Sequence, residues 1–212
     1  MKILIIGKGK MGTLLKEFFE KEYQVFNIDT LSLPTMKNVF DYIIDFSHPA
    51  SLKKYKNFVT DKTKIIIGTT NFSSEDKDYI LFLSKMNPIV IDSNFSSGID
   101  FIKRLLYVVN ETKYDVTINE THHKNKLDTP SGTTKDFLSI LNKKTPTVNS
   151  YRIDGENGIH EIVLSNEYET LKFEHKVLSK EVFCLGVKKS LLFLKDKENG
   201  LFTFKDVIDC GY

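Results

Sequence analysis

The sequence predicts an α/β fold, in which a doubly wound parallel sheet is followed by a smaller α+β domain with a mixed sheet. Three observations in the 212 residues lead to this expectation. Short apolar runs alternate with amphipathic helical stretches in the first half. A glycine-rich turn follows the first apolar run directly. After residue 96, apolar and polar residues alternate with a period of two, as in strands that cover one face only.

The elements of the first half come as strands and helices in turn. Residues 3–6 form an apolar run without a polar face, which is typical of a strand covered by helices on both sides. Residues 11–22 place apolar side chains on one stripe at helical spacing, which predicts a helix. Right-handed crossovers would bring the carboxyl ends of the strands to one edge, where ligands bind. Further strands are expected at 24–28, 42–46, 64–68 and 88–91, with helices at about 50–58 and 74–86.

The second half has a different order of elements. Strand-like stretches that alternate apolar and polar residues predict an antiparallel or mixed sheet. A last helix at about 179–194 precedes a short tail. Before it we expect a helix at about 97–110, a strand around 116–120, a polar loop at 121–131, a helix at about 132–143, and strands at about 148–153, 159–165 and 168–176.

Composition excludes several classes of protein. Thirty lysines and arginines against 28 acidic residues give a formal net charge of only +2, which argues against a nucleic-acid partner. No apolar run approaches the ~20 residues of a membrane span, and the N-terminal run is too short for a signal peptide. Cys184 and Cys210 form neither a CxxC pair nor a zinc spacing. We expect a cytoplasmic protein without a membrane partner, whose fold begins at residue 1.

The glycine-rich turn at 7–12 reads GKGKMG, a GxGxxG pattern between a strand and a helix. Its first glycine permits a tight turn, the second lets backbone approach a pyrophosphate, and the third allows the helix to pack closely on the strand. The alternative is a glycine turn in an α/β fold that binds no nucleotide. The pattern predicts a Rossmann-type dinucleotide site made by Gly7, Lys8, Gly9, Lys10, Met11 and Gly12.

Asp29 ends the second strand, 20 residues after Gly9. A carboxylate there can bind both ribose hydroxyls and repels a 2′-phosphate, so it favours NADH over NADPH. Thr30, and not an arginine, comes next. Lys8 and Lys10 could still reach a phosphate; otherwise they are solvated surface lysines.

Three other strand ends carry small polar residues. They read DFS at 45–47, GTT at 68–70 and DSNFSSG at 92–98. At the carboxyl edge of a parallel sheet, such residues can line a nicotinamide and its ribose. Taken singly, each is more often an ordinary loop with helix caps.

The densest cluster of reactive side chains is ETHHKNKLDTPSGT at 120–133. His122 can give or take a proton near neutral pH, and Lys126 can pair a carboxylate or donate a proton. Ser131, Gly132 and Thr133 would offer a hydroxyl and backbone N–H groups to a second carboxylate, so a dicarboxylate fits. We expect no metal, because adjacent histidines rarely chelate one ion. The alternative is a solvated basic loop before a capped helix.

Three residues downstream are less specific. Arg152 can hold a carboxylate in a bidentate manner. His160 is open to a functional or a structural role, whereas we expect His175 to be structural.

The segment 120–133 resembles the signature of the dihydrodipicolinate reductase family, E-x-H-H-x-x-K-x-D-x-P-S-G-T. The glycine turn, the three strand ends, and the segments 152–160 and 179–186 also fall in the family's order, so the resemblance covers nearly the whole chain. It implies a dinucleotide-binding Rossmann domain at 1–96 with 190–212. It also implies an α+β domain at 97–189 that binds the substrate and builds a homotetramer.

The same resemblance implies an activity. Family members reduce 4-hydroxy-tetrahydrodipicolinate (dihydrodipicolinate) to tetrahydrodipicolinate with NADH or NADPH, on the diaminopimelate route to lysine. By that resemblance, His122 is the proton donor and acceptor and Lys126 a second proton donor. The substrate carboxylates would be bound by His123, Gly132 and Thr133. The cofactor residues would be the glycine turn, Asp29, Gly68, Thr69, Thr70, Ser93, Asn94, Phe95 and Ser96.

The chain departs from the family pattern at several points. Asn71 stands where the family often has glycine, Asp92 and Ser93 replace an Ala-Pro pair, and Asp154 replaces a glycine. These changes bear on cofactor preference and oligomer packing more than on the reaction. Two alternatives stay open. One is another small Rossmann dehydrogenase of the amino-acid type, and the other is a dinucleotide-sensing regulator without turnover.

Overall fold

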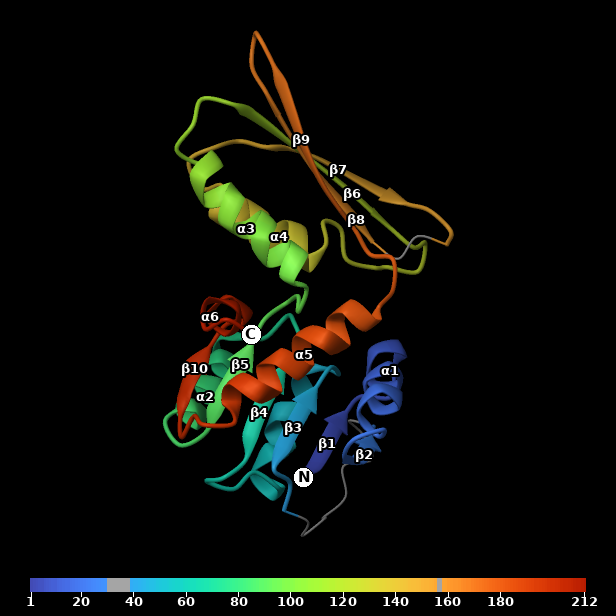
Figure 1. Ribbon diagram of the computed structural model, residues 1–212, viewed down its shortest axis with the longest axis vertical. Helices are drawn as coiled ribbons and strands as arrows, with labels where there is room; N and C mark the ends of the chain where they lie inside the picture. Colours follow the sequence, from blue (N-terminus) through green and yellow to red (C-terminus); the bar gives the residue numbers. More distant parts are fainter. Residues whose placement is uncertain (30–38, 156–157) are drawn as a thin grey trace. The chain divides into compact units, whose positions relative to one another are not determined.

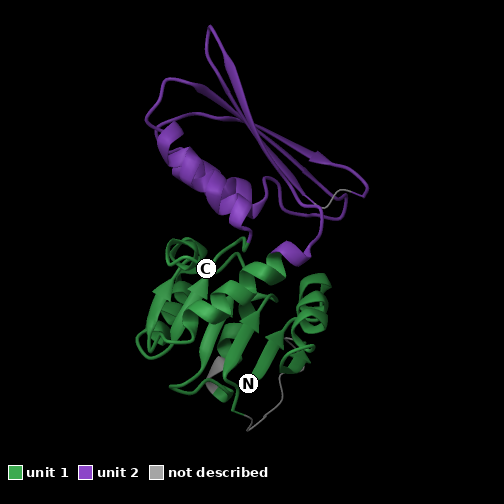
Figure 2. Cartoon of the chain, in the orientation of Figure 1, with its two compact units in different colours: residues 1–95, 183–212 green, residues 96–182 purple. Residues whose placement is uncertain are grey.

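The computed structural model describes residues 1–29, 39–155 and 158–212, so Thr30 lies outside the described residues (Figure 1). The chain divides into two compact units, which are coloured separately in Figure 2. Unit 1 comprises Met1–Phe95 and Phe183–Tyr212, and unit 2 comprises Ser96–Val182. The C-terminal tail therefore belongs to the same unit as the N-terminal half.

Unit 1 is built on a six-stranded sheet in the order β10-β5-β4-β3-β1-β2. Every strand pairs in parallel with its neighbours, which confirms the predicted Rossmann-like sheet. The edge strand contributed by the tail was not predicted. The bounds are β1 (Lys2–Ile6), β2 (Gln24–Ile28), β3 (Tyr42–Asp45), β4 (Lys64–Ile67), β5 (Pro88–Ile91) and β10 (Gly200–Phe202).

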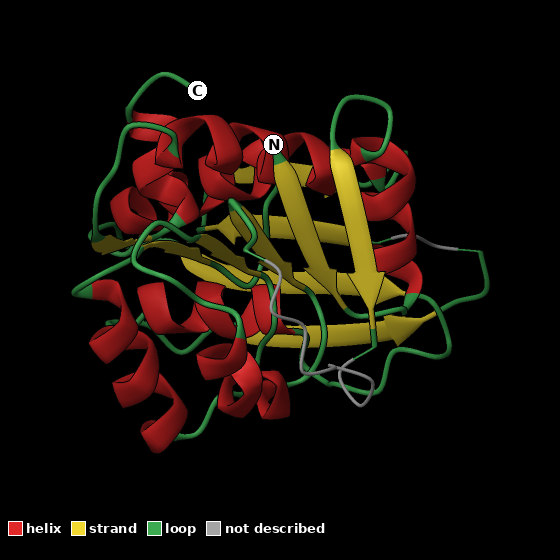
Figure 3. Ribbon diagram, turned by 90° about the horizontal axis from the view of Figure 1, so that it is seen from below, coloured by secondary structure: helices red, strands yellow, loops and turns green. Residues whose placement is uncertain are grey.

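Helices cover both faces of this sheet (Figure 3). In β1, Ile3 and Ile5 face one cluster of apolar side chains, and Leu4 and Ile6 face the other. The first cluster contains residues of α1, α5 and α6, and the second contains residues of η1 and α2. Burial on both faces explains why the strand lacks a polar side. The helices are α1 (Lys10–Phe19), the 3-10 helix η1 (Pro49–Asn57), α2 (Ser74–Ser84), α5 (Glu181–Leu194) and α6 (Phe204–Asp209).

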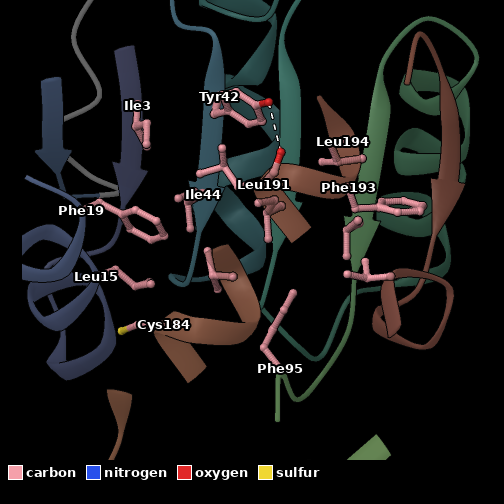
Figure 4. Packing of buried hydrophobic residues seen from close by; sticks show 14 of the residues in the cluster. Ile3, Leu15, Phe19, Tyr42, Ile44, Phe95, Cys184, Leu191, Phe193 and Leu194 are labelled. Atoms are coloured by element: carbon pink, nitrogen blue, oxygen red, sulfur yellow. Dashed lines mark hydrogen bonds between the residues drawn. The ribbon is translucent and has the colours of Figure 1, made fainter. Parts of the chain in front are cut away.

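A buried hydrogen bond ties the centre of the sheet to α5. The hydroxyl of Tyr42 donates to the carbonyl of Leu191 over 3.1 Å (Figure 4). Burial raises the pKa of Tyr42 to about 12, so this donor keeps its proton at neutral pH. Cys184 lies fully buried in the same cluster, where it packs as an apolar side chain.

Unit 2 is a four-stranded mixed sheet in the order β7-β6-β8-β9, with α3 and α4 packed on one face. β6 pairs in parallel with β7, whereas the β6–β8 and β8–β9 pairs are antiparallel. This confirms the predicted mixed sheet. Val116 and Ile118 face the helices, in alternation with polar residues. The bounds are α3 (Ser97–Val109), β6 (Asp115–His122), α4 (Gly132–Ile140), β7 (Thr147–Arg152), β8 (Ile159–Ser165) and β9 (Thr170–Lys176).

The chain passes from unit 2 back to unit 1 at a different residue from the expected domain limit. The first crossing follows Phe95, next to the expected limit at 96/97, but the second follows Val182 inside α5, and not 189/190. The physical reason is that α5 buries side chains from Cys184 onward in the core of unit 1. Which ligand each unit holds stays a prediction. No helix in the described ranges is long and apolar enough to cross a membrane.

Candidate active site

The glycine turn between β1 and α1 uses its three glycines in two ways. Gly7 has a φ of +113°, and a Cβ there would lie 2.6 Å from the carbonyl oxygen of Phe46. At Gly12, a Cβ would lie 1.9 Å from the carbonyl oxygen of Gly7. At Gly9, no described atom beyond its chain neighbours lies within 4 Å of that position. The fold itself requires the outer two glycines, and the open space at Gly9 fits the approach of a pyrophosphate.

The N-terminus of α1 is suited to an anion. Its N-cap, Gly9, offers no side chain, and its first turn holds no acidic residue. The helix dipole and the first backbone N–H groups are therefore left for a ligand to satisfy. Lys8 and Lys10 are exposed beside this end of the helix, and Met11 packs against the core.

Asp29 lies next to the same turn. It follows β2 directly and is half-buried. The N–H of Gly7 donates to the carbonyl of Ile28 over 2.8 Å. The side-chain amide of Asn27, which the sequence did not single out, donates to the carbonyl of Gly7 over 2.8 Å. These two bonds join the end of β2 to the glycine turn. One dinucleotide could therefore place its ribose at Asp29 and its pyrophosphate at the glycine turn.

The end of β3 is organised by a buried carboxylate. Asp45 accepts hydrogen bonds from the amide of Ser47 (3.0 Å) and the hydroxyl of Thr69 (2.9 Å). The carbonyl of Asp45 accepts from the backbone N–H groups of Gly68 and Thr69. One acidic residue thus holds two of the predicted cofactor segments together. The hydroxyl of Thr69 serves this anchor, whereas Thr70 is exposed at the same edge.

The turn that follows Gly68–Thr70 accounts for one departure from the family pattern. Asn71 has a φ of +64°, in the left-handed region that favours glycine. Asparagine is among the residues that adopt this conformation most readily after glycine. The replacement therefore keeps the shape of the backbone.

The side chains at the end of β5 are less accessible to a cofactor than the sequence suggests. The ring of Phe95 is 1% exposed and packs against the rings of Phe46 and Phe204, with 5.5 Å between centroids in each pair. The side chain of Phe95 therefore belongs to the core of unit 1, and a contact of this residue with a cofactor stays a prediction. Ser93 and Asn94, just before it, are half-buried.

Ser96 begins unit 2 and is fully buried. Its hydroxyl lies 3.0 Å from Nε2 of His175. A Cβ at Gly98 would lie 2.7 Å from the same imidazole. His175 thus packs against the start of α3, as a structural histidine would.

His122 is the last residue of β6, on the face that the helices cover. Its side chain is buried, and its ring meets that of His160 edge-to-face at 5.1 Å. Burial, followed by the positive charge of Lys126, lowers the pKa of His122 to about 4. With the chain's own groups alone, the imidazole is neutral at pH 7. A dianionic ligand beside it would raise that pKa and favour the protonated ring.

Lys126 and the start of α4 share one carboxylate. Oδ1 of Asp128 lies 2.9 Å from Nζ of Lys126, and Oδ2 accepts the backbone N–H of Gly132 over 3.1 Å. Burial raises the pKa of Asp128, but the hydrogen bond and charge of Lys126 outweigh this and keep it below its usual value. Two groups that the sequence assigns to the substrate therefore have the geometry to bind a carboxylate.

The other predicted substrate residues surround the same helix start. The hydroxyl of Ser131 accepts the N–H of Thr134 over 3.2 Å, so Ser131 caps α4. The N–H of Ser131 donates to both oxygens of Glu120. Thr133 is buried in the first turn, and His123 is half-buried just after β6. Their roles in binding stay predictions.

Arg152 has different partners from those that the sequence suggested. Its guanidinium donates to the carbonyls of Lys126 and Asp128 and lies beside the carboxylate of Glu120. It therefore binds the chain itself and does not present its donors to a ligand. Sequence reasoning assigned no role to Glu120, although it is the first residue of the family signature and a charged residue at a core-facing position of a strand.

Three potential metal ligands lie together in unit 2. Ligand atoms of Glu120, His122 and His160 are within 4.8 Å of one another. However, both oxygens of Glu120 already accept hydrogen bonds, and Arg152 contacts one of them. A cation would have to displace these donors, so this cluster does not fit a metal site.

Most of the chain matches two family models. The model described as "Dihydrodipicolinate reductase, N-terminus" matches residues 26–95. The model described as "Dihydrodipicolinate reductase, C-terminus" matches residues 98–208. The glycine turn precedes the first match.

Relatives that the chain matches over nearly their whole length are named 4-hydroxy-tetrahydrodipicolinate reductase. The chain is 31% identical to the 4-hydroxy-tetrahydrodipicolinate reductase of Alkaliphilus oremlandii, over 99% of this chain and 99% of the relative. It is 32% identical to the enzyme of that name from Thermosipho africanus, over 98% of each.

Solved structures show the same fold. The chain is similar to a dipicolinate-bound dihydrodipicolinate reductase from Paenisporosarcina sp., with a TM-score of 0.73 and 18% identity over 96% of this chain and 97% of that one. It is less similar to an aspartate dehydrogenase from Thermotoga maritima, with a TM-score of 0.53 and 14% identity over 93% and 97%.

Proposed function

The chain belongs to the dihydrodipicolinate reductase family, and on that premise we propose how its residues carry out the reaction. It is an NAD(P)H-dependent oxidoreductase that converts 4-hydroxy-tetrahydrodipicolinate to tetrahydrodipicolinate in the diaminopimelate route of lysine biosynthesis. The observation that carries our assignment of roles is the carboxylate-binding geometry of Lys126 and the start of α4, next to the buried His122.

Unit 1 holds the cofactor. The backbone at Gly9 and the N-terminus of α1 bind the pyrophosphate, and Asp29 binds the ribose hydroxyls. When bound, the reduced nicotinamide supplies a hydride to the substrate. Because the carboxylate of Asp29 repels a 2′-phosphate, we expect NADH to be preferred. Lys8 and Lys10 are exposed close by and can weaken this preference.

Unit 2 holds the dicarboxylate substrate. The ammonium of Lys126 and the backbone N–H groups of Gly132 and Thr133 bind carboxylate oxygens, with His123 as a further partner. A substrate carboxylate takes the place of the Asp128 side chain, which otherwise binds two of these groups. Fixing both ends of the substrate sets the orientation of the carbon that is reduced.

His122 and Lys126 provide the proton. Loss of the 4-hydroxyl group as water gives the dihydro compound. Addition of hydride to that compound leaves negative charge on the ring, and a proton has to be delivered to it. The two negative charges of the substrate raise the pKa of His122 from about 4, so that its imidazole is protonated in the complex with the substrate. The ammonium of Lys126 stabilises the developing charge and serves as the second proton donor.

A coupled assay tests the function. Dihydrodipicolinate synthase, pyruvate and aspartate semialdehyde generate the substrate in place, and the absorbance of NADH or NADPH is followed. We expect consumption that requires every component. NADH binding without consumption would favour a different dehydrogenase or a dinucleotide sensor. Failure to bind either nucleotide would contradict the role of the glycine turn.

We propose a homotetramer from the family resemblance, with the face of the unit 2 sheet that α3 and α4 leave uncovered as the contact surface between copies. A row of polar side chains crosses it. Asn149 donates to Asn119, Asn119 donates to Glu161, and Lys172 pairs with Glu161. Light scattering after gel filtration should give four times the 24.4 kDa chain mass. We also propose a cytoplasmic location, in keeping with the two separate free cysteines.

A further inference from the structure

The loop between β6 and α4, at residues 123–131, has little apolar contact with the rest of unit 2. Lys124, Asn125 and Thr129 are exposed, and the side chain of Leu127 is 97% exposed. A loop without a buried apolar side chain has little packing energy to keep it in one conformation. Yet this loop carries Lys126, whose ammonium has to lie at a fixed place relative to His122 and the start of α4. The loop therefore depends on hydrogen bonds for its position.

Arg152 supplies those hydrogen bonds. Its Nε donates to the carbonyl of Lys126 (3.2 Å), and its Nη2 donates to the carbonyl of Asp128 (2.6 Å) and the hydroxyl of Thr129 (2.8 Å). The three acceptors lie on both sides of the exposed Leu127. Arg152 itself is fixed at the end of β7, where it is the register partner of His122 in the parallel pair with β6.

Glu120 supplies the corresponding anchor for α4. Its side chain is fully buried two residues before His122. Its oxygens accept the N–H of Ser131 (3.0 and 3.1 Å) and the hydroxyls of Thr134 (2.6 Å) and Ser150 (2.8 Å). Burial raises the pKa of Glu120, but the hydrogen bonds from Ser131, Thr134 and Ser150 outweigh it and hold the pKa at about 2. The carboxylate of Glu120 is therefore charged at neutral pH.

The two anchors touch each other. Nη2 of Arg152 lies 3.4 Å from Oε1 of Glu120. Through this pair, the strand end that carries His122, the loop that carries Lys126 and the helix start at Gly132 are joined in one polar network. We propose that Arg152 and Glu120 are positioning residues, which fix the distances among the proton donors and the carboxylate-binding N–H groups. This inference rests on the proposed function of the same loop.

The conservative substitution Arg152→Lys tests the proposal. Lysine keeps the charge but has a single ammonium, which cannot reach the acceptors on both sides of Leu127 at once. We expect the full-length variant to bind dipicolinate at least about tenfold more weakly in calorimetry without nucleotide. We also expect kcat to fall about 100-fold, because small misplacements of catalytic groups cost that much. The dissociation constant of NADH, which unit 1 determines, should change less than about twofold.

Two further variants keep the test decisive. Arg104→Lys makes the same substitution at the chain's only other arginine, which pairs with Asp100 on α3, and should leave dipicolinate binding unchanged. Thr129→Val removes one exposed acceptor of Arg152 without touching the core, and should weaken dipicolinate binding about threefold. It decides the matter if Arg152→Lys does not fold.

The outcomes separate this inference from the proposed function. A folded Arg152→Lys enzyme with wild-type dipicolinate affinity and kcat would overturn the positioning role while leaving the reductase function intact. A lower melting temperature with unchanged binding and kcat would show a structural role only, and would also overturn it. If the wild type reduces no substrate, the proposed function fails. Selective loss of dipicolinate binding in Arg152→Lys would even then support the positioning role.

Discussion

The environment of His122 decides what this residue can do. A solvent-exposed imidazole would be partly protonated near neutral pH, but burial and the charge of Lys126 lower the pKa of His122 to about 4. The ring is therefore protonated at neutral pH only when negative charge arrives beside it. In the proposed complex, a substrate with two carboxylates would bring that charge, which would couple protonation of His122 to substrate binding.

Removing either proton donor should separate turnover from cofactor binding. We expect His122→Ala and Lys126→Ala to lower kcat by about 100-fold or more, the usual contribution of general acid–base catalysis. The dissociation constant of NADH should stay the same, because both side chains belong to unit 2. The control is Lys124→Ala, which removes an exposed lysine two residues before Lys126. Wild-type turnover in either test variant would contradict the assigned roles.

Asp128 is expected to compete with the substrate. It holds Lys126 and the N–H of Gly132, the two groups that we propose bind a substrate carboxylate. Asp128→Asn removes the negative charge and keeps the shape. We expect calorimetry to show about fivefold tighter binding of dipicolinate, since a like charge at this range costs about 1 kcal/mol or more. Weaker binding would instead mean that Asp128 holds Lys126 in place for the substrate.

Asp29 should set the choice between the two cofactors. Asp29→Asn removes the repulsion of a 2′-phosphate, so we expect kcat/KM with NADPH to rise about tenfold relative to NADH. The ratio of the two values in the coupled assay measures the effect. Asp41→Asn, at an acidic residue in the same unit, serves as the control. An unchanged ratio would place the selectivity elsewhere, for example on Lys8 and Lys10.

Among the secondary-structure elements, the ends of two strands hold neighbouring segments in place, one in each unit. Asp45 at the end of β3 and Glu120 near the end of β6 are each fully buried, and each holds neighbouring segments by several hydrogen bonds. A buried carboxylate is costly unless donors surround it, and here the donors belong to neighbouring segments of the same unit. Asp45 thus orders the predicted cofactor segments of unit 1, and Glu120 orders the predicted substrate segment of unit 2.

The glycine turn between β1 and α1 allows a matched pair of substitutions. Gly9→Ala adds a Cβ where the described chain leaves open space, so we expect a stable protein that has lost affinity for NADH. Gly12→Ala places a Cβ against the carbonyl of Gly7, so we expect a loss of stability. Thermal melts together with nucleotide titrations distinguish the two. Unchanged NADH binding in Gly9→Ala would contradict a pyrophosphate site there.

Across the whole molecule, buried histidines link stability to pH. Burial lowers the pKa of His122 to about 4 and, with the charge of His122 as second cause, lowers that of His160 to about 3. The pKa of His175 is lowered by burial as well. Unfolding returns these rings to a pKa near 6.5, so the unfolded chain binds more protons below that pH. The free energy of unfolding should therefore fall as the pH drops from 6.5 toward 4.

Urea unfolding at several pH values measures this dependence. Each imidazole contributes a slope of at most about 1.4 kcal/mol per pH unit. We expect His160→Gln to flatten the dependence on pH, whatever it does to stability at pH 7. The control His48→Gln makes the same substitution at an exposed histidine of unit 1. If the free energy of unfolding of His160→Gln depends on pH as steeply as that of the wild type, His160 does not contribute to the pH dependence.

Local spacing in the sequence was enough to predict the parallel sheet of unit 1, the mixed sheet of unit 2, the glycine turn and the loop that carries Lys126. His122, expected in that loop, is instead the last residue of β6. Strand and helix periods, and the backbone freedom of glycine, act over a few residues, so a linear pattern records them. The tertiary structure alone decided that β10 pairs with β5, although 112 residues separate the register partners Pro88 and Gly200.

The tertiary structure also decided that Arg152 holds the loop that carries Lys126, through acceptors 23 to 26 residues away. It decided as well that Asp45 and Glu120 hold neighbouring segments by hydrogen bonds. The pKa of His122 depends on burial by the packed fold and on charges from other segments. Long-range hydrogen bonds and desolvation arise only when distant segments pack together, and for that reason no local pattern contains them.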